Sequence, residues 1–177
     1  MAEHAAALAA TTPHSIPVTV SSDPRRSSSE SSGAAFAGAT SAWPEPLGLA
    51  ALHDPERVRE FADVARQEYL AVAIPSCLRP QIDLGTEPRR GRQLHTFGND
   101  SAFVAEVAAA YVEGFQLSPD LGPTSVATMA KHVPGGGRSR AARTRTSRRG
   151  ASRSTRAVGS RTTWWRSARP SPRAPRP

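Results

Sequence analysis

The sequence predicts an α/β fold with a parallel sheet over residues 1–137, followed by a disordered tail over residues 138–177. Short β-branched runs alternate with amphipathic helical patterns in the first part, and the composition changes abruptly after Gly137. Strands that alternate with helices are typical of parallel sheets covered by helices. The two parts therefore obey different structural rules.

The charge of the chain divides at the same place. Its 177 residues include 23 Lys and Arg and 15 Asp and Glu, a net charge of +8. Residues 138–177 hold 13 arginines and no acidic residue, so residues 1–137 carry −5. The tail has too little apolar surface to offset an ordering cost of about 1–2 kcal/mol per residue. We therefore expect the tail to be disordered.

Three runs are predicted strands. Residues 16–20 (IPVTV) form a β-branched run before a turn-like segment. Residues 77–84 form the second, which leads into a loop with Pro and Arg, and residues 125–133 (SVATMAKHV) form the third. Short apolar runs bounded by turn residues are typical of buried strands.

Two amphipathic helices are predicted between these strands. The first begins at Asp54, which can cap the helix, with Pro55 suited to the first helical position. The second is capped by Asp100 or Ser101. Apolar residues in each helix are spaced mostly by three and four, which places them on one buried stripe. The first stripe comprises Val58, Phe61, Ala62, Ala65, Tyr69 and Val72, and the second comprises Val104, Val107, Ala108, Tyr111 and Phe115.

Polar side chains follow each predicted strand. Asp23 comes after the first, residues 87–92 after the second, and Lys131 and His132 end the third. Ligand-binding groups of parallel sheets gather at the carboxyl ends of the strands. A carboxylate that accepts and cations that donate hydrogen bonds suit a ligand rich in hydroxyls. Each of these groups also has an ordinary structural interpretation. Asp23 fits a common turn with Pro24, residues 87–89 fit a surface ion pair, and Lys131 and His132 fit a solvent-facing pair.

Several classes of site are not indicated. A single cysteine, Cys77, excludes a disulfide framework and a four-cysteine zinc site, and we expect a buried strand thiol. His53 and His95 have no partner at metal-ligand spacing and are interpreted as loop histidines. The glycine triplet 135–137 lacks the Lys-Ser/Thr that follows in a phosphate loop. We expect neither a metal nor a cofactor.

The sequence gives little information on the compartment. No apolar run approaches the roughly 20 residues that span a membrane. Residues 1–10 include Glu3 and no basic n-region, which argues against a signal peptide. We expect no membrane partner, and a cytoplasmic location is favoured while the compartment and the oligomeric state stay open.

The segment from residue 16 to residue 136 resembles the catalytic barrel of glycoside hydrolase family 3, of the β-glucosidase type. The matching stretches are IPVTVSSDPR, AWPEPLGLAA, DPERVREFADVARQEYLAV, PQIDLGTEPRRGR, TFGND, AAAYVEGFQ and LGPTSVATMAKHVPGGG. The last is similar to the KHFPGG signature of the family. The resemblance implies a (β/α)8 TIM barrel, of which residues 1–137 would supply about three β/α units. It also implies retaining hydrolysis of a β-glucoside or a related oligosaccharide, from its non-reducing end, through a covalent glycosyl-enzyme.

The resemblance also implies roles for four residues. Asp23 corresponds to the aspartate that accepts from sugar hydroxyls in the −1 subsite, and Arg89 to the substrate-binding arginine of the family. Lys131 and His132 correspond to the Lys-His pair that binds the same ring. Because the family turns both of these side chains inward, we expect an unusual peptide, such as a cis non-proline bond, near His132.

The sequence departs from the family pattern at several positions around these residues. Arginine stands where the family usually has histidine or tryptophan, asparagine replaces a glutamate, and valine replaces the phenylalanine of KHFPGG. These positions are Arg26, Arg79, Arg90, Asn99 and Val133. The proposed sugar ligands stay in place, while the side chains around them change.

The larger departure begins after Gly137, where the family continues with an acidic, aromatic segment that leads to the nucleophilic aspartate. GC-rich codons for residues 142–161, read one position out of phase, permit GEDPHFA-x-GREQVYPGGRF, which resembles that continuation. We hypothesise that a frameshift produced the tail. The nucleophile and the acid/base would then lie in missing sequence, so we name no catalytic residue and expect no turnover.

An alternative function rests on the tail. Thirteen arginines would bind nucleic acid through phosphate contacts and counterion release, and Trp164 and Trp165 could stack on bases. No zinc-finger, helix-turn-helix or RNA-binding sheet motif accompanies them. The alternative is therefore non-specific binding, with no specific nucleic-acid partner.

Overall fold

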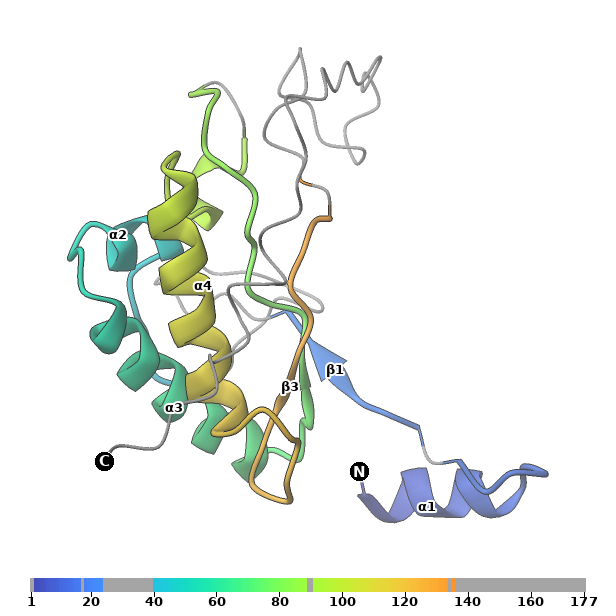
Figure 1. Cartoon of the computed structure of the whole chain (residues 1–177). Coiled ribbons are helices and arrows are strands. Elements are labelled where there is room, and N and C mark those ends of the chain that lie inside the picture. Colours follow the sequence, from blue (N-terminus) through green and yellow to red (C-terminus); the bar gives the residue numbers. More distant parts are fainter. Residues whose placement is uncertain (1, 17, 24–39, 89–90, 134, 136–177) are drawn as a thin grey trace, which may run out of the picture.

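The structure, a computed structural model, describes residues 2–16, 18–23, 40–88, 91–133 and 135 (Figure 1). Arg89 and the tail predicted to be disordered lie outside these residues. The described elements are α1 (Ala2–Ala10), β1 (Ser21–Ser22), α2 (Pro46–Ala50), α3 (Pro55–Ala71), β2 (Ser76–Cys77), the 3-10 helix η2 (Gln93–His95), α4 (Ser101–Gln116) and β3 (Ala127–Thr128). The longest of them, α3 and α4, both occur in the predicted places.

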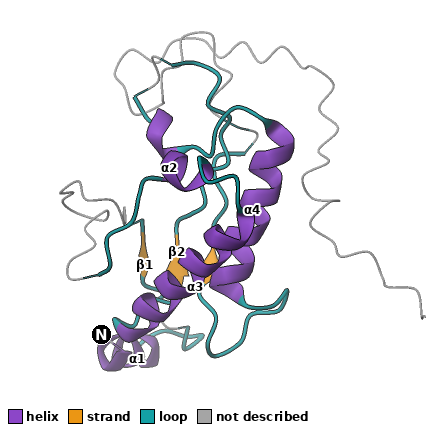
Figure 2. Ribbon diagram, turned by 90° about the vertical axis from the view of Figure 1, so that its left-hand side faces the viewer, coloured by secondary structure: helices purple, strands orange, loops and turns teal. Residues whose placement is uncertain are grey.

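The three strands form a parallel sheet in the order β1-β2-β3 (Figure 2). Ser76 is level with Ser21 on one side and with Ala127 on the other. Pairing continues past the strands, where Gln81 and Lys131 form a parallel bridge. The predicted α/β class with a parallel sheet is confirmed.

The predicted strand over residues 16–20 is wrong in position. The pairing occurs at Ser21–Ser22 instead, and Ile16 and Val18 are 69% and 56% exposed. A strand forms where its backbone meets a partner, and β-branched composition alone specifies no partner. The other two predicted strands overlap true strands that are much shorter, because β2 starts one residue earlier and ends at Cys77, and β3 is only Ala127–Thr128. After β2, Pro80 has no N–H to donate to a ladder.

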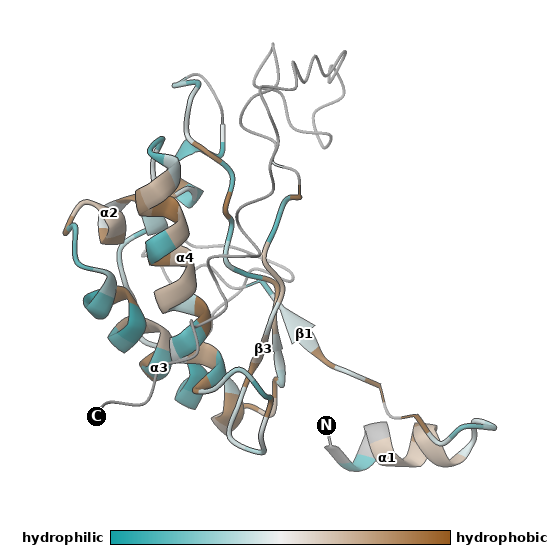
Figure 3. Cartoon of the chain, in the orientation of Figure 1, coloured by the Kyte–Doolittle hydropathy of each residue, from teal (hydrophilic) through white to brown (hydrophobic). Residues whose placement is uncertain are grey.

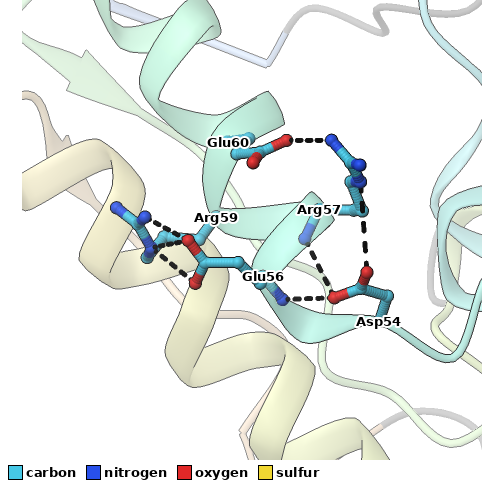
Figure 4. A network of polar contacts seen from close by, with 5 residues as sticks. All are labelled: Asp54, Glu56, Arg57, Arg59 and Glu60. Atoms are coloured by element: carbon cyan, nitrogen blue, oxygen red, sulfur yellow. Dashed lines mark hydrogen bonds and ion pairs between the residues drawn. The ribbon is translucent and has the colours of Figure 1, made fainter.

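Helix α3 begins as predicted. The Asp54 carboxylate accepts from the backbone N–H of Glu56 at 3.0 Å and of Arg57 at 3.3 Å (Figure 4). Exposed ion pairs join Arg57 to Glu60 and Arg59 to Glu56 in the next turn. The hydrogen bond from Arg59 lowers the pKa of Glu56. Such exposed pairs contribute little to stability, so the cap is the stronger signal for the start of the helix.

Helix α4 is capped by Asp100, whose carboxylate accepts from the N–H of Ala102 and of Phe103, both at 2.9 Å. Every residue of the predicted α4 stripe is buried. The α3 stripe is buried except for Val72, which is 51% exposed because the helix has already ended at Ala71. Figure 3 shows polar and apolar stretches along α3, as a helix with one buried face requires.

Helices α3 and α4 pack closely and cover one side of the sheet (Figure 1). Gly114 makes this approach possible, because a Cβ added there would lie 2.4 Å from the carbonyl oxygen of Arg59. Tyr111 and Phe115 stack with centroids 5.0 Å apart, and Cys77 of β2 and Val126, directly before β3, belong to the same core. No helix in the described part of the chain is long and apolar enough to cross a membrane.

Candidate functional site

A cluster of charged side chains lies at the carboxyl ends of the three strands. Asp23 follows β1, Arg79 and Asp83 follow β2, and Lys131 and His132 follow β3. These five residues are called the Asp23 cluster below. Parallel strands place their carboxyl ends at one edge of the sheet, which is why residues so far apart in sequence meet here.

Asp23 lies at the centre of the Asp23 cluster. Lys131 Nζ donates to Asp23 Oδ2 at 2.5 Å, and Arg79 Nε lies 2.7 Å from Oδ1. The side chain of Arg79 is only 7% exposed, and those of Lys131 and Asp23 are 17% and 19% exposed. With a cation at each oxygen, the carboxylate has a fixed position. Its field is less screened by solvent than that of the exposed pairs on α3.

The second pair of the Asp23 cluster joins His132 to Asp83. Nδ1 of His132 lies 2.7 Å from Oδ2 of Asp83, which is fully buried, whereas the His132 side chain is 45% exposed. An ionised carboxylate can only accept hydrogen bonds, so Nδ1 is the nitrogen that carries the proton. In the neutral ring Nε2 is then left as an acceptor, on a side chain that solvent reaches.

The backbone between the two ligand candidates has the expected unusual geometry. The Lys131–His132 peptide is a cis non-proline bond, as the family resemblance predicted. The Lys131 side chain reaches Asp23, and the His132 side chain reaches Asp83. Both consecutive side chains therefore contribute to the Asp23 cluster.

The structure brings together three of the four predicted sugar ligands, Asp23, Lys131 and His132, while Arg89 lies outside the described residues. Arg79 was noted only as a departure from the family pattern, and Asp83 was missed. A signal was present, because Arg79, Gln81 and Asp83 alternate along a predicted strand and alternate residues share a face. Three polar residues at alternate positions of a predicted buried strand indicate a site.

Of the two histidines interpreted as loop residues, one lies in a short helix. His95 lies in η2 and is 5% exposed, so it is a buried residue of a short helix. The prediction was wrong because a lone histidine has no periodicity from which burial can be inferred. His53 is exposed and stacks on Phe103 with ring centroids 4.4 Å apart.

Cys77 is buried, as predicted, at 1% exposure. Its Sγ lies 3.9 Å from the hydroxyl of Tyr111. Burial raises the pKa of the Cys77 thiol, and it raises the pKa of Tyr111 well above its usual value. A neutral, buried thiol is a poor nucleophile. Among the described residues, no three His, Cys, Asp or Glu side chains group as metal ligands would.

Comparison with known proteins identifies relatives over 69–73% of the chain. The chain is 56% identical over 123 residues to Beta-glucosidase C of Emericella nidulans, which covers 69% of this chain and 20% of that protein. It is 46% identical over 132 residues to a Periplasmic beta-glucosidase/beta-xylosidase of Dickeya chrysanthemi, covering 73% of this chain and 20% of that protein. The chain thus spans about one fifth of the length of these curated relatives.

Solved structures show the same relationship. A β-glucosidase from Erythrobacter marinus is similar with a TM-score of 0.67 and 30% identity, over 76% of this chain and 17% of that one. The β-glucosidase from Listeria innocua has a TM-score of 0.63 and 26% identity, over 77% and 18%. The sequence profile of the Glycosyl hydrolase family 3 N terminal domain matches residues 1–149. The chain therefore belongs to glycosyl hydrolase family 3, through the N-terminal domain of that family.

Proposed function

We propose that the protein is a family 3 glycoside hydrolase of the β-glucosidase type and that residues 1–137 supply part of its −1 sugar subsite. In this proposal Asp23, Arg89, Lys131 and His132 bind the glycosyl ring of a β-glucoside or a related oligosaccharide. The observation that carries it is the 2.5 Å contact between Lys131 and Asp23 at the carboxyl ends of the strands. The names of the relatives, β-glucosidases and a β-glucosidase/β-xylosidase, support the substrate class.

We also propose that the described strands are about three β/α units of a (β/α)8 barrel. The spatial order β1-β2-β3 is the order of the strands in sequence, and all three are parallel. Helix α3 connects β1 to β2, and α4 connects β2 to β3. A barrel of this type has that sequential, parallel arrangement and carries its ligand site at the carboxyl ends of the strands.

The chemistry of the Asp23 cluster suits a ring of hydroxyl groups. The Asp23 carboxylate accepts hydrogen bonds from hydroxyls, and Lys131 donates to their oxygen atoms. Nε2 of His132 offers an acceptor on the exposed side of its ring. A set of donors and acceptors that the protein already holds in place binds sugar with little loss of side-chain entropy.

The 177-residue chain, taken alone, should bind sugar without hydrolysing it. A retaining enzyme needs two carboxyl groups about 5–5.5 Å apart that flank the scissile bond. Asp23 is held by two cations, and Asp83 is fully buried against His132. Neither carboxylate is free to attack an anomeric carbon or to protonate a leaving group.

Calorimetric titration of the full chain with methyl β-glucoside tests the binding proposal. Asp23→Asn should weaken binding by about tenfold or more, since it removes charge-assisted hydrogen bonds. Asp120→Asn, at an exposed loop position, is the matched control and should leave binding unchanged. Equal affinity of wild type and Asp23→Asn would refute the proposal. Release of aryl groups from an aryl β-glucoside above buffer, abolished by Asp23→Ala, would refute the predicted lack of turnover.

A second candidate function, non-specific nucleic-acid binding, is favoured only by the charge of +13 on residues 138–177. We propose that this tail is out of frame, so any such binding would be a property of its charge. The affinity should fall steeply with salt and disappear when residues 138–177 are deleted. Sequencing the coding DNA in all three phases tests the frame, and an intact reading frame through residue 177 would overturn this proposal.

A further inference from the structure

A small cavity lies beside the Asp23 cluster, inside the described region. Its volume is about 30 Å³. Arg79, Pro80 and Gln81 line it from the strand side, and Leu49, Phe97 and Tyr111 are among the residues that line it from the helices and loops. A cavity of about 10–15 Å³ is already enough to hold one water molecule. The space is therefore large enough for one or two waters.

The cavity has polar atoms that need partners. Gln81 is 1% exposed, and neither Oε1 nor Nε2 of its side chain has a hydrogen-bond partner in the described region. Nη1 of Arg79 is likewise buried without a partner there, although Nε of the same group faces Asp23. Buried polar groups are almost always hydrogen-bonded, to protein or to ordered water, because leaving them unpaired is costly.

We propose that this cavity is a water-binding site and that Gln81 is a positioning residue for the Asp23 cluster. A bound water would accept a hydrogen bond from Nη1 of Arg79 or Nε2 of Gln81 and donate one to Oε1 of Gln81. The guanidinium of Arg79 is then held on one side by Asp23 and on the other by water that Gln81 orients. The water site does not depend on the proposed function, whereas an effect of Gln81 on sugar binding rests on that function.

The guanidinium of Arg79 needs a hydrogen-bond partner in the cavity. A guanidinium has five N–H donors in a fixed planar arrangement and no acceptor. At 7% exposure, the Arg79 side chain obtains few partners from bulk solvent, and its 2.7 Å contact with Asp23 is made through Nε, which leaves Nη1 without a hydrogen-bond partner in the described region. A water between the guanidinium and an amide that both donates and accepts supplies a partner in another direction.

NMR of the full, unmodified chain gives the first test. Water-selective cross-relaxation should show long-lived contacts between water and the side-chain amide of Gln81. A dry cavity, with no such contacts and a fast-exchanging Gln81 amide, would overturn the water site. The measurement needs no substitution, so it decides the question even where a variant fails to fold.

The variant Gln81→Met gives the second test, because methionine has a similar length and no comparable hydrogen-bonding group. Losing a hydrogen bond to a charged group corresponds to roughly tenfold, so exchange of the Arg79 Nη1 protons should quicken by about that factor and methyl β-glucoside should bind more weakly. Val126→Ala also opens space at a fully buried position but removes no polar group, and should leave the exchange rate unchanged. Unchanged Arg79 exchange in Gln81→Met would overturn the positioning role. If Arg79 exchange quickens in Gln81→Met but the wild-type chain binds no glucoside, the positioning role is supported and only the proposed function is refuted.

Discussion

Lys131 and Asp23 are 108 positions apart in the sequence, yet Nζ of one lies 2.5 Å from Oδ2 of the other. They follow the two outer strands of the described sheet, so their contact passes over the end of β2. Arg79, which follows β2, lies 2.7 Å from the second oxygen of the same carboxylate. A single carboxylate thus joins the ends of all three strands, and any role in binding depends on a correctly assembled sheet.

Lys131→Met should destabilise the fold. Removing the cation leaves a largely buried carboxylate with one partner instead of two, which costs about 1–3 kcal/mol. Urea denaturation followed by circular dichroism measures the change in the free energy of unfolding. The control is Arg59→Met, which removes a cation from an exposed pair on α3 and should change the stability little. Equal losses of unfolding free energy in the two variants would contradict the prediction that the buried Lys131–Asp23 pair matters more than the exposed pair.

Asp83→Asn should allow His132 to populate both of its neutral tautomers. The carboxylate can only accept from Nδ1–H, whereas an asparagine amide can either accept or donate, so both neutral tautomers become populated. Nitrogen-15 NMR of the imidazole above pH 8 distinguishes them. His95, on η2, provides an internal control in the same spectra and should not change. A single Nδ1–H tautomer of His132 in both proteins would show that Asp83 does not select it.

Gly114→Ala should weaken the packing of α3 against α4. The added Cβ would lie 2.4 Å from the Arg59 carbonyl oxygen and 2.5 Å from Cβ of Ala62, so the helices must separate. Overpacking of this kind costs about 1–3 kcal/mol. Thermal and urea unfolding measure it. Gly122→Ala is the matched control, since its Cβ would meet only the Ser125 hydroxyl oxygen at 3.9 Å. A Gly114 variant as stable as wild type would mean that the two helices adjust freely.

Stability should fall at alkaline pH. Burial raises the pKa of Cys77 and raises that of Tyr111 well above its usual value. In the unfolded chain these groups ionise at about pH 8.5 and about pH 10, so above those values the unfolded state releases protons that the folded state keeps. The contribution is fully present below about pH 8.5 and declines as the pH rises.

The urea midpoint measured from pH 7.5 to pH 10.5 checks this dependence. It should be level at first and then fall. Tyr111→Phe removes the phenol, and its midpoint should decline less between pH 9.5 and pH 10.5 than that of the wild type. A midpoint that rises with pH, or identical slopes in the two proteins, would refute the assignment.

The helices and the core could be predicted from the sequence because their signals are local. Asp54 and Asp100 both cap helices where expected, and the apolar spacing identified the buried stripes except at Val72. The first strand was misplaced because its position depends on a partner, Ser76–Cys77, more than 50 residues away. Local composition carries no information about which backbone a strand will meet.

The candidate site was predictable only in part. Asp23, Lys131 and His132 were identified through the family resemblance, and the structure places them together. Arg79 and Asp83 lie in a run with Pro, Ile and Leu, where apolar neighbours hide polar residues that alternate. Their partners come from other strands, so the contacts depend on register, and register is a property of the assembled sheet.

The central position of β2 has a consequence for how this protein can vary. In the segment that follows β2, Arg79 contacts Asp23, Gln81 forms a parallel bridge with Lys131, and Asp83 contacts His132. Inserting or deleting one residue between Cys77 and Arg79 would shift all three residues by one position against their partners from the other strands. A substitution in this segment removes one contact, whereas a change in its length by a single residue would displace all of them together.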